Sequence, residues 1–157
     1  MTSIDPTRES WLVPLKALLA DMDGAIAELY ARRGIAGVRP RFSMALIRLH
    51  HRGPLSVKEL AAEVDVTHSA MSQTVSAMRR EGLVESTPGP DARTRLVALT
   101  AKGADLVPFL EAEWRATEAA VAQLDGELPY RVTQVIADMA AALRERPFVD
   151  RISEQLR

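Results

Sequence analysis

The sequence predicts a mainly α-helical protein with one small β-hairpin, and three observations support this class. Apolar residues recur at helical spacing over most of the 157 residues. Two short helix signals lie a few residues apart in the middle of the chain. Directly after Gly82 the period changes to that of two short strands, which a Pro/Gly-rich segment joins.

The first helix is expected over residues 11–33, where Gly34 and Gly37 follow its last turn. A shorter helix is expected after Pro40, and Gly53-Pro54 ends it. Both segments carry apolar residues three and four positions apart, as an amphipathic helix does.

Two short capped helices follow. Ser56 and Glu59 form a capping box, in which the hydroxyl and the carboxylate satisfy free N–H groups at a helix start. After a tight turn, Thr67 is the predicted N-cap of a helix that runs to Glu81 and ends at Gly82. Its expected inward residues are Ala70, Met71, Thr74, Val75 and Met78.

Strands then replace helices. Residues 83–86 and 94–99 are expected to form two short strands, with residues 87–93 as the hairpin tip. Two short helices joined by a tight turn and followed by a hairpin make a winged helix-turn-helix, which we place at residues 39–100.

The C-terminal third returns to helical spacing. Thr100 can cap a long helix over residues 101–124, which Pro108 should kink unless the helix starts later. A final helix is expected over residues 127–146, followed by a tail or one more short helix.

The amphipathic ends carry more apolar surface than one winged domain can cover, so residues 1–38 and 101–157 are expected to form a helical dimerisation region. The predicted fold is therefore mainly α with a small β-hairpin wing: a winged helix-turn-helix flanked by N- and C-terminal dimerisation helices.

Composition limits the functions that the chain can have. With 47% hydrophobic and 26% charged residues it can bury a core, and no apolar run is long enough to cross a membrane. The absence of cysteine excludes disulfides, thiolate-bound zinc, iron–sulfur clusters and thiol switches. Residues 1–9 lack the basic and apolar regions of a secretory signal, so we expect a cytoplasmic protein.

The net charge of −1 is unevenly distributed. Residues 39–103 carry ten basic and six acidic side chains, whereas residues 1–38 have a net charge of −1 and residues 104–157 one of −4. A cationic segment between acidic ends is typical of a protein whose middle contacts a polyanion. Random clustering on a solvated surface would give the same distribution, so charge alone does not decide between the two.

The outward face of the helix after Thr67 has the chemistry of a DNA-reading surface. Its side chains are small and polar, and no carboxylate occurs before Glu81. Small side chains let the helix approach base edges, and Gln73 can pair with both N6 and N7 of adenine. Arg79 suits phosphates, as do the N–H groups at the two helix starts. An ordinary solvated helix is the alternative interpretation, but it normally carries several acidic residues.

Several motifs resemble the MarR family of bacterial transcriptional regulators. They are Gly53-Pro54-Leu55-Ser56, Glu59-Leu60-Ala61, Val66-Thr67, Glu81-Gly82-Leu83-Val84, Asp91-Ala92-Arg93 and Leu96-Val97-Ala98-Leu99-Thr100. The resemblance covers residues 11–146. It implies a homodimeric DNA-binding regulator. In many members a small, often aromatic, anion enters a cleft between the dimer and DNA-binding regions, and the protein then releases its DNA.

The resemblance also implies residue roles. Arg93 matches the wing arginine that enters the minor groove and Asp91 the carboxylate that orients it, although the two could instead only stabilise the hairpin turn. Ser86 and Thr87 stand where family members usually carry basic residues. Affinity should therefore depend more on Arg93, on Arg95 and on the helix after Thr67, which corresponds to the family's DNA-recognition helix. The predicted DNA-binding residues are Ser56, Lys58, Thr67, His68, Ser69, Ser72, Gln73, Ser76, Arg79, Asp91, Arg93 and Arg95.

An effector site is a further implication of the resemblance. The family's cleft between the first, second and fifth helices corresponds here to Met44, Arg48, His51, Phe109 and Trp114. Arg48 or His51 would neutralise a carboxylate or phenolate. Alternatively, Arg48 is an exposed helix charge and Trp114 anchors a dimer interface.

The sequence shows no catalytic or metal-binding constellation. His50 and His51 are expected on different helix faces, and no base-orienting group accompanies His68. We therefore expect no enzyme activity, no metal and no cofactor.

The predicted function is that of a homodimeric, sequence-specific regulator of transcription that binds a pseudo-palindromic site in double-stranded DNA. We expect a repressor that a small-molecule ligand releases. The alternative is a winged helix that contacts proteins and has no affinity for DNA.

Overall fold

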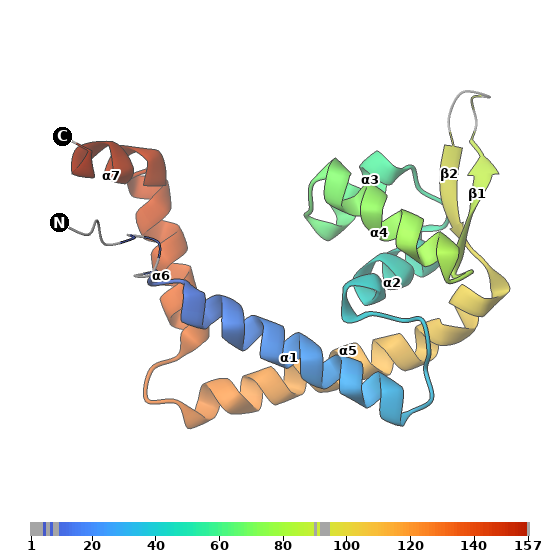
Figure 1. The fold of residues 1–157 in the computed structure, drawn as a ribbon, viewed down its shortest axis with the longest axis horizontal. Coiled ribbons are helices and arrows are strands. Elements are labelled where there is room, and N and C mark those ends of the chain that lie inside the picture. Colours follow the sequence, from blue (N-terminus) through green and yellow to red (C-terminus); the bar gives the residue numbers. More distant parts are fainter. Residues whose placement is uncertain (1–4, 6, 8–9, 90, 92–94, 157) are drawn as a thin grey trace. The chain divides into compact units, whose positions relative to one another are not determined.

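The computed structural model describes residues 5, 7, 10–89, 91 and 95–156, and Figure 1 shows the helices and the hairpin that they form. The chain divides into two compact units, Met1–Glu111 and Ala112–Arg157, and each is described by itself. The predicted class, mainly α with a β-hairpin wing, is confirmed.

The described part of the first unit begins with helices that follow the predicted order. They are α1 (Val13–Arg32), the short 3-10 helix η2 (Pro40–Phe42), α2 (Ser43–Arg52), α3 (Val57–Val64) and α4 (His68–Arg80). A proline lies in the first turn of α1, where its missing N–H costs nothing, because a first-turn N–H has no partner within the helix. Gly34 follows α1 with a φ of 71°, a left-handed conformation that glycine adopts without strain.

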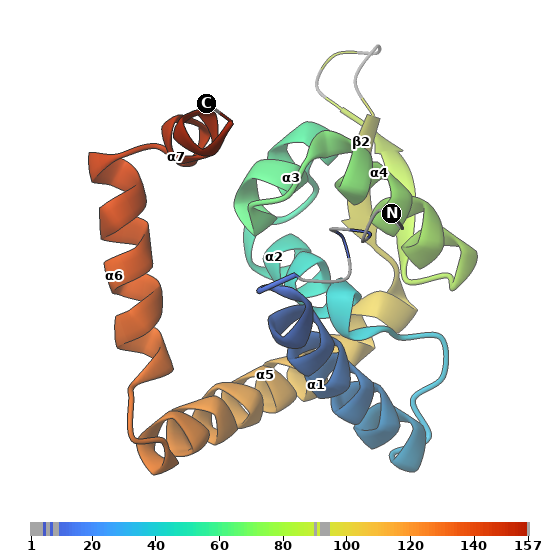
Figure 2. The same cartoon turned by 60° about the vertical axis from the view of Figure 1, so that its left-hand side comes forward.

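The hairpin consists of β1 (Val84–Pro88) and β2 (Arg95–Leu99), which pair antiparallel with Val84 opposite Leu99. Leu55 pairs with Val97 as well: each N–H donates to the other's carbonyl, at 3.1 and 2.7 Å. This bridge attaches the wing to the segment between α2 and α3. Figures 1 and 2 both show the hairpin next to α4.

The core of the first unit lies beneath α3, α4 and the hairpin. Its fully buried side chains come from η2, α2, α3, α4, β2 and α5 and include Phe42, Leu46, Leu60, Met78, Val97 and Leu110. The phenol of Tyr30, from α1, forms a buried hydrogen bond of 2.8 Å with the Ser43 hydroxyl. Because a close-packed core resists small displacements, the outer face of α4 is presented on a rigid support.

The helix α5 (Ala101–Glu127) begins in the first unit, and α6 (Val132–Glu145) and α7 (Phe148–Gln155) belong to the second. No described residue of α6 or α7 is buried. The turn before α6 is fixed by Asp125, whose Oδ1 accepts hydrogen bonds from the N–H groups of Val132 (2.6 Å) and Thr133 (3.3 Å). The Thr133 hydroxyl donates to its Oδ2 at 2.9 Å. These bonds, the one from the Thr133 hydroxyl first, hold the pKa of Asp125 below its ordinary value.

Some details differ from the sequence-based expectations. Ala70, expected to point inward, is exposed, since a small apolar residue beside the buried stripe gives no signal of its own. The first strand extends to Pro88 rather than residue 86, and α5 extends to Glu127. The C-terminal residues form the short helix α7, one of the two expected outcomes. Among the described residues, no helix has the length and apolarity that a bilayer crossing needs.

Candidate nucleic-acid interface

The N-terminus of α4 is formed by Thr67, as predicted. Thr67 is extended, and its hydroxyl accepts a hydrogen bond of 3.2 Å from the N–H of Ala70. The N–H groups of His68 and Ser69 have no partner within the helix, as at any helix start, and both residues are exposed. This end of α4 therefore offers backbone donors and a positive dipole end to an anion.

The exposed face of α4 carries the polar residues that the sequence placed there. Ser69, Ser72, Gln73 and Ser76 are all exposed, while Met71, Val75 and Met78 face the core. The hydroxyl of Ser76 donates to the carbonyl oxygen of Ser72 at 2.8 Å, so Ser76 offers only acceptor capacity to a ligand.

Gln73 lies at the centre of this exposed face. Within the part of the chain that the structure describes, its side-chain amide forms no hydrogen bond. One amide oxygen and two amide hydrogens are then available, which is the pattern that pairs with adenine N6 and N7 in the major groove.

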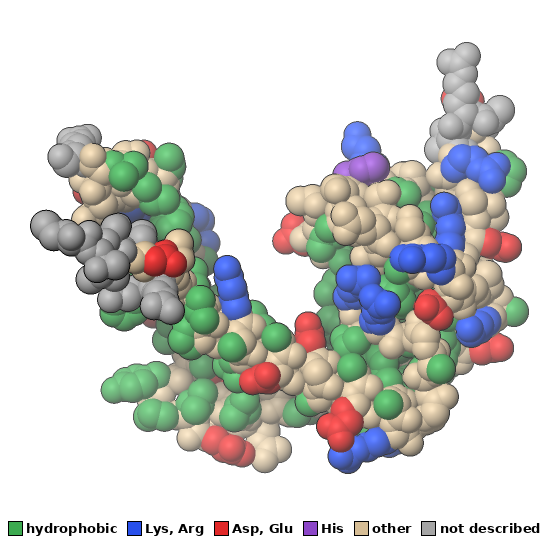
Figure 3. Space-filling view, in the orientation of Figure 1, with side chains coloured by type: hydrophobic (Ala, Val, Ile, Leu, Met, Phe, Trp, Pro, Cys, Tyr) green, Lys and Arg blue, Asp and Glu red, His purple; other side chains and the backbone are tan. Residues whose placement is uncertain are grey.

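Basic side chains lie at the opposite end of the helix and on the hairpin. Arg79 and Arg80 occupy the last turn of α4 and are exposed, and cations are favoured at this end of a helix dipole. Figure 3 shows Lys and Arg side chains over the hairpin and the adjoining end of α4. From His68 to Arg80 the helix carries two arginines and no carboxylate, a charge balance that suits phosphates.

The start of α3 is closed by its capping box. The N–H and the hydroxyl of Ser56 both donate to Glu59 Oε2, at 2.8 and 2.7 Å, and the hydroxyl accepts from the Glu59 N–H at 3.2 Å. The hydroxyl bond is the main reason why the pKa of Glu59 lies below its ordinary value. Ser56 thus has both of its donors committed to Glu59, whereas Lys58 is exposed.

The wing shows a contact that sequence reasoning missed. Arg95 is exposed, and its Nε donates to the hydroxyl of Ser86 across the hairpin at 3.1 Å. Ser86, where the resemblance implied a basic residue, therefore orients a neighbouring arginine. Arg95 and Ser86 are diagonal neighbours across the hairpin, so the register of the two strands, once known, could have indicated this contact. Asp91 is exposed, and Arg93 lies outside the described residues.

The expected effector residues are distributed as follows. Met44 is half-buried and Arg48 is exposed. His51 Nε2 and Glu111 Oε1 lie 2.6 Å apart, and the ring of Phe109 packs edge-on against Tyr30 with centroids 5.7 Å apart. Trp114 belongs to the second unit.

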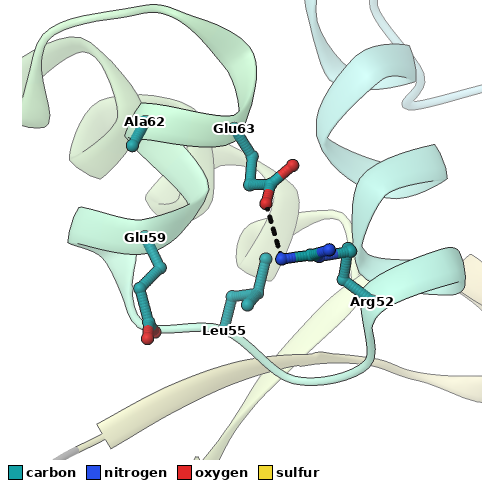
Figure 4. A pocket seen from close by; sticks show the side chains of 5 residues that line it. All are labelled: Arg52, Leu55, Glu59, Ala62 and Glu63. Carbon is teal, nitrogen blue, oxygen red and sulfur yellow. Dashed lines mark ion pairs between the residues drawn. The ribbon is translucent and has the colours of Figure 1, made fainter.

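Two shallow depressions occur on the first unit, and neither contains an expected effector residue. One, of about 460 Å³, is bounded by the end of α2 and by α3, and Figure 4 shows Arg52 crossing it to reach Glu63 at 3.1 Å. The second, of about 580 Å³, lies between the segment after α1 and the start of α5, next to Lys102 and Asp105. Among the described residues, no group of three or more His, Asp or Glu side chains could hold a metal ion.

Residues 36–93 match the model of the MarR family. No curated protein matches the chain significantly. A MarR family transcriptional regulator from Silicibacter pomeroyi is similar in structure, with 26% identity and a TM-score of 0.53, over 86% of this chain and 99% of that one.

Two further solved structures share the fold. A probable transcriptional regulator from Pseudomonas aeruginosa is 23% identical, with a TM-score of 0.55 over 82% of this chain and 96% of that one. The M. tuberculosis transcriptional regulator MOSR, in complex with DNA, is 22% identical, with a TM-score of 0.60 over 89% of this chain and all (100%) of that one. The resemblance to the MarR family is thus confirmed: residues 36–93 match its model, and the chain shares the fold of a solved MarR family regulator.

Proposed function

We propose that the protein is a transcriptional regulator that binds double-stranded DNA as a homodimer, at a pseudo-palindromic site. The observation that carries this proposal is the exposed face of α4, which is polar, free of carboxylates and held on a packed core. Such a face fits the major groove, where it meets base edges between two rows of phosphates. The DNA complex of the similar M. tuberculosis regulator supports the same use of this fold.

The homodimer is supported by apolar side chains that lack cover. In α1, Leu15, Leu18 and Leu19 are about half exposed, and Trp11 just before it is 97% exposed. In the second unit, α6 and α7 expose a further set: Val132, Val135, Ile136, Met139, Leu143, Phe148, Val149 and Ile152. Large apolar side chains exposed along a helix are usually covered by a partner, and a second copy of the chain would cover those of each unit.

Repression and release by a small ligand are the finer parts of the proposal. A dimer that covers promoter DNA blocks transcription, and a ligand that changes the spacing of its two recognition helices ends the block. Since the chain has no cysteine, thiol oxidation does not provide the switch. An anion that reaches Arg48 is the ligand class to try first. This function requires the cytoplasmic location expected from the sequence.

The test is a fluorescence anisotropy titration of duplex DNA from the region upstream of the protein's own gene, at several salt concentrations. We expect binding whose log affinity falls linearly with log salt, by roughly 0.9 per phosphate neutralised. A scrambled duplex should bind roughly a thousandfold or more weakly. Equal affinity for both duplexes would contradict sequence-specific binding, and no binding at low salt would favour a winged helix that contacts proteins instead.

A further inference from the structure

The chain that leaves α4 is bonded to the start of α5 at three successive carbonyl oxygens. Lys102 Nζ donates to the carbonyl of Glu81 at 2.8 Å, and the Thr100 hydroxyl donates to that of Gly82 at 2.7 Å. The Thr100 N–H donates to the carbonyl of Leu83 at 3.1 Å. These carbonyls belong to the C-cap of α4 and to the two residues after it, so the three bonds anchor the segment in which α4 ends.

One hydroxyl serves both helices. While the Thr100 hydroxyl donates to Gly82, it also accepts a hydrogen bond of 3.1 Å from the N–H of Gly103 and so caps α5. The hydroxyl proton is thereby bonded to the segment after α4, and one of its lone pairs to the first turn of α5. The end of α4 and the beginning of α5 share this group, and neither can rotate without breaking one of its bonds.

Gly103 brings the two elements into direct backbone contact. It is buried, and a Cβ at this position would lie 2.1 Å from the carbonyl oxygen of Leu83 and 3.3 Å from the Leu99 side chain. Real Cβ atoms do not approach a backbone oxygen so closely, so any larger residue would push the first turn of α5 away from the segment after α4. Glycine is required here for close approach rather than for its backbone angles.

We propose that Thr100, Lys102 and Gly103 are positioning residues that fix the direction of the recognition helix α4 relative to the base of α5. These three residues, together named the α4–α5 latch, act on backbone groups of Glu81, Gly82 and Leu83 and not on DNA. If the apolar core alone set the direction of α4, removing the latch would leave that direction unchanged. The consequence for DNA binding rests on the proposed function, whereas the positioning role does not.

A distance measurement within one chain tests the positioning role without DNA. Because the chain has no cysteine, Ser69→Cys and Asp105→Cys give two exposed labelling sites, one on α4 and one on α5. Ser69 lies on the order of 17 Å from Arg80 along α4, at 1.5 Å per residue, so a change in the direction of α4 moves the first nitroxide label relative to the second. Dilution with the unlabelled protein isolates distances within a single chain.

Thr100→Val removes the hydroxyl at nearly constant volume, and Thr100→Ser retains it as the matched control. We expect a broadened distance distribution for Thr100→Val and the original narrow one for Thr100→Ser. Lys102→Met, a change at an exposed position, removes the bond to Glu81 and should broaden the distribution less. Gly103→Ala should shift the mean distance, because its methyl group displaces α5.

Circular dichroism shows whether each variant is folded. If Thr100→Val does not fold, Lys102→Met decides the question: a broadened distribution supports the latch and an unchanged one overturns it. Unchanged distributions in folded Thr100→Val and Lys102→Met would likewise overturn the proposal.

DNA binding by the same unlabelled variants separates this inference from the proposed function. Thr100→Val should lower affinity for the upstream duplex roughly tenfold, or about 1.4 kcal/mol, because binding must then also order α4; Thr100→Ser should not lower it. If the natural chain binds no DNA while the distances change as expected, the latch stands and the DNA-binding proposal fails. If the natural chain binds DNA and Thr100→Val changes neither distance nor affinity, only the latch fails.

Discussion

The helices α4 and α6 have nearly the same length, 13 and 14 residues, but the exposed face of α4 is polar and that of α6 is apolar. The buried stripe of α4, which includes Met71 and Val75, leaves a polar surface outside. The helix α6 has no buried residue, and Ile136 and Met139 are 60% and 56% exposed. The apolar side of α4 is covered within its own unit, so α4 offers polar groups to a ligand. The apolar side of α6 is not covered there and would be buried by another apolar surface. The two faces are therefore suited to different partners.

The largest expected effect comes from charging the apolar face of α6. In the double variant Val135→Asp, Ile136→Asp, each copy would bury two carboxylates without partners when two copies associate. We expect the dimer dissociation constant to rise by more than about 1,000-fold, or about 4 kcal/mol. Sedimentation equilibrium across the micromolar range measures it.

Ala137→Asp is the matched control for this variant. Ala137 is exposed on the same helix, and at 100° per residue it lies on the side opposite to Met139 and Val135. The variant Ala137→Asp should leave the dimer dissociation constant nearly unchanged. A double variant that associates as tightly as the natural chain would show that the apolar face of α6 is not the contact between copies.

The next largest effect is on the free energy of unfolding, and it distinguishes a buried core residue from an exposed apolar residue. Leu46→Ala, at a fully buried position, should lower the free energy of unfolding by about 2–5 kcal/mol at every protein concentration. Ile136→Ala should destabilise the protein only at concentrations where it is dimeric. Urea unfolding at two concentrations, one on each side of the dimer dissociation constant, separates the two cases. A concentration-independent loss for Ile136→Ala would place that residue in a monomer core.

Gln73→Ala tests whether α4 reads bases. It should cost about 1–3 kcal/mol of binding free energy on the upstream duplex and almost nothing on scrambled DNA, because a base-edge contact carries sequence information. Gln134→Ala, which removes an exposed amide from α6, should change neither affinity. Equal weakening on both duplexes would mean that Gln73 contacts phosphate rather than bases.

The smallest effect concerns the turn before α6. The pKa of Asp125 is lowered on folding, so the ionised carboxylate stabilises the second unit above the ordinary Asp pKa of 3.8. This stabilisation is lost as the pH falls below that value and approaches the lower pKa of the folded state. Asp125→Asn should therefore reduce thermal stability at pH 7 and converge with the natural chain in acid. A difference that grows on acidification would contradict the assignment.

Local features of the fold could be predicted from the sequence. The capping box of Ser56 and Glu59 and the Thr67 cap depend on residues three positions apart, and the structure forms both. The exposed polar face of α4 follows from the same helical period. These signals lie within one or two helical turns, which is the range over which sequence patterns report directly on structure.

Contacts between distant segments could not be predicted. The pairing of His51 with Glu111 joins positions 60 residues apart, and the bond from Arg95 to Ser86 depends on the hairpin register. The Thr100–Gly82 bond likewise requires that the end of α4 meets the start of α5. The tertiary fold decides such contacts, and a single sequence shows only that their donors and acceptors exist.

The account's central claim is that α4 meets DNA while the apolar faces meet a second copy. Sedimentation velocity with a fluorescent upstream duplex tests both parts at once, using Ser72→Glu on the exposed face of α4 and the double α6 variant. The natural chain should place two copies on one duplex. Ser72→Glu should remain dimeric and lose the DNA, and the double α6 variant should be monomeric and bind the duplex weakly. A Ser72→Glu dimer that binds the duplex as tightly as the natural chain, or a single copy bound at full affinity, would contradict the claim.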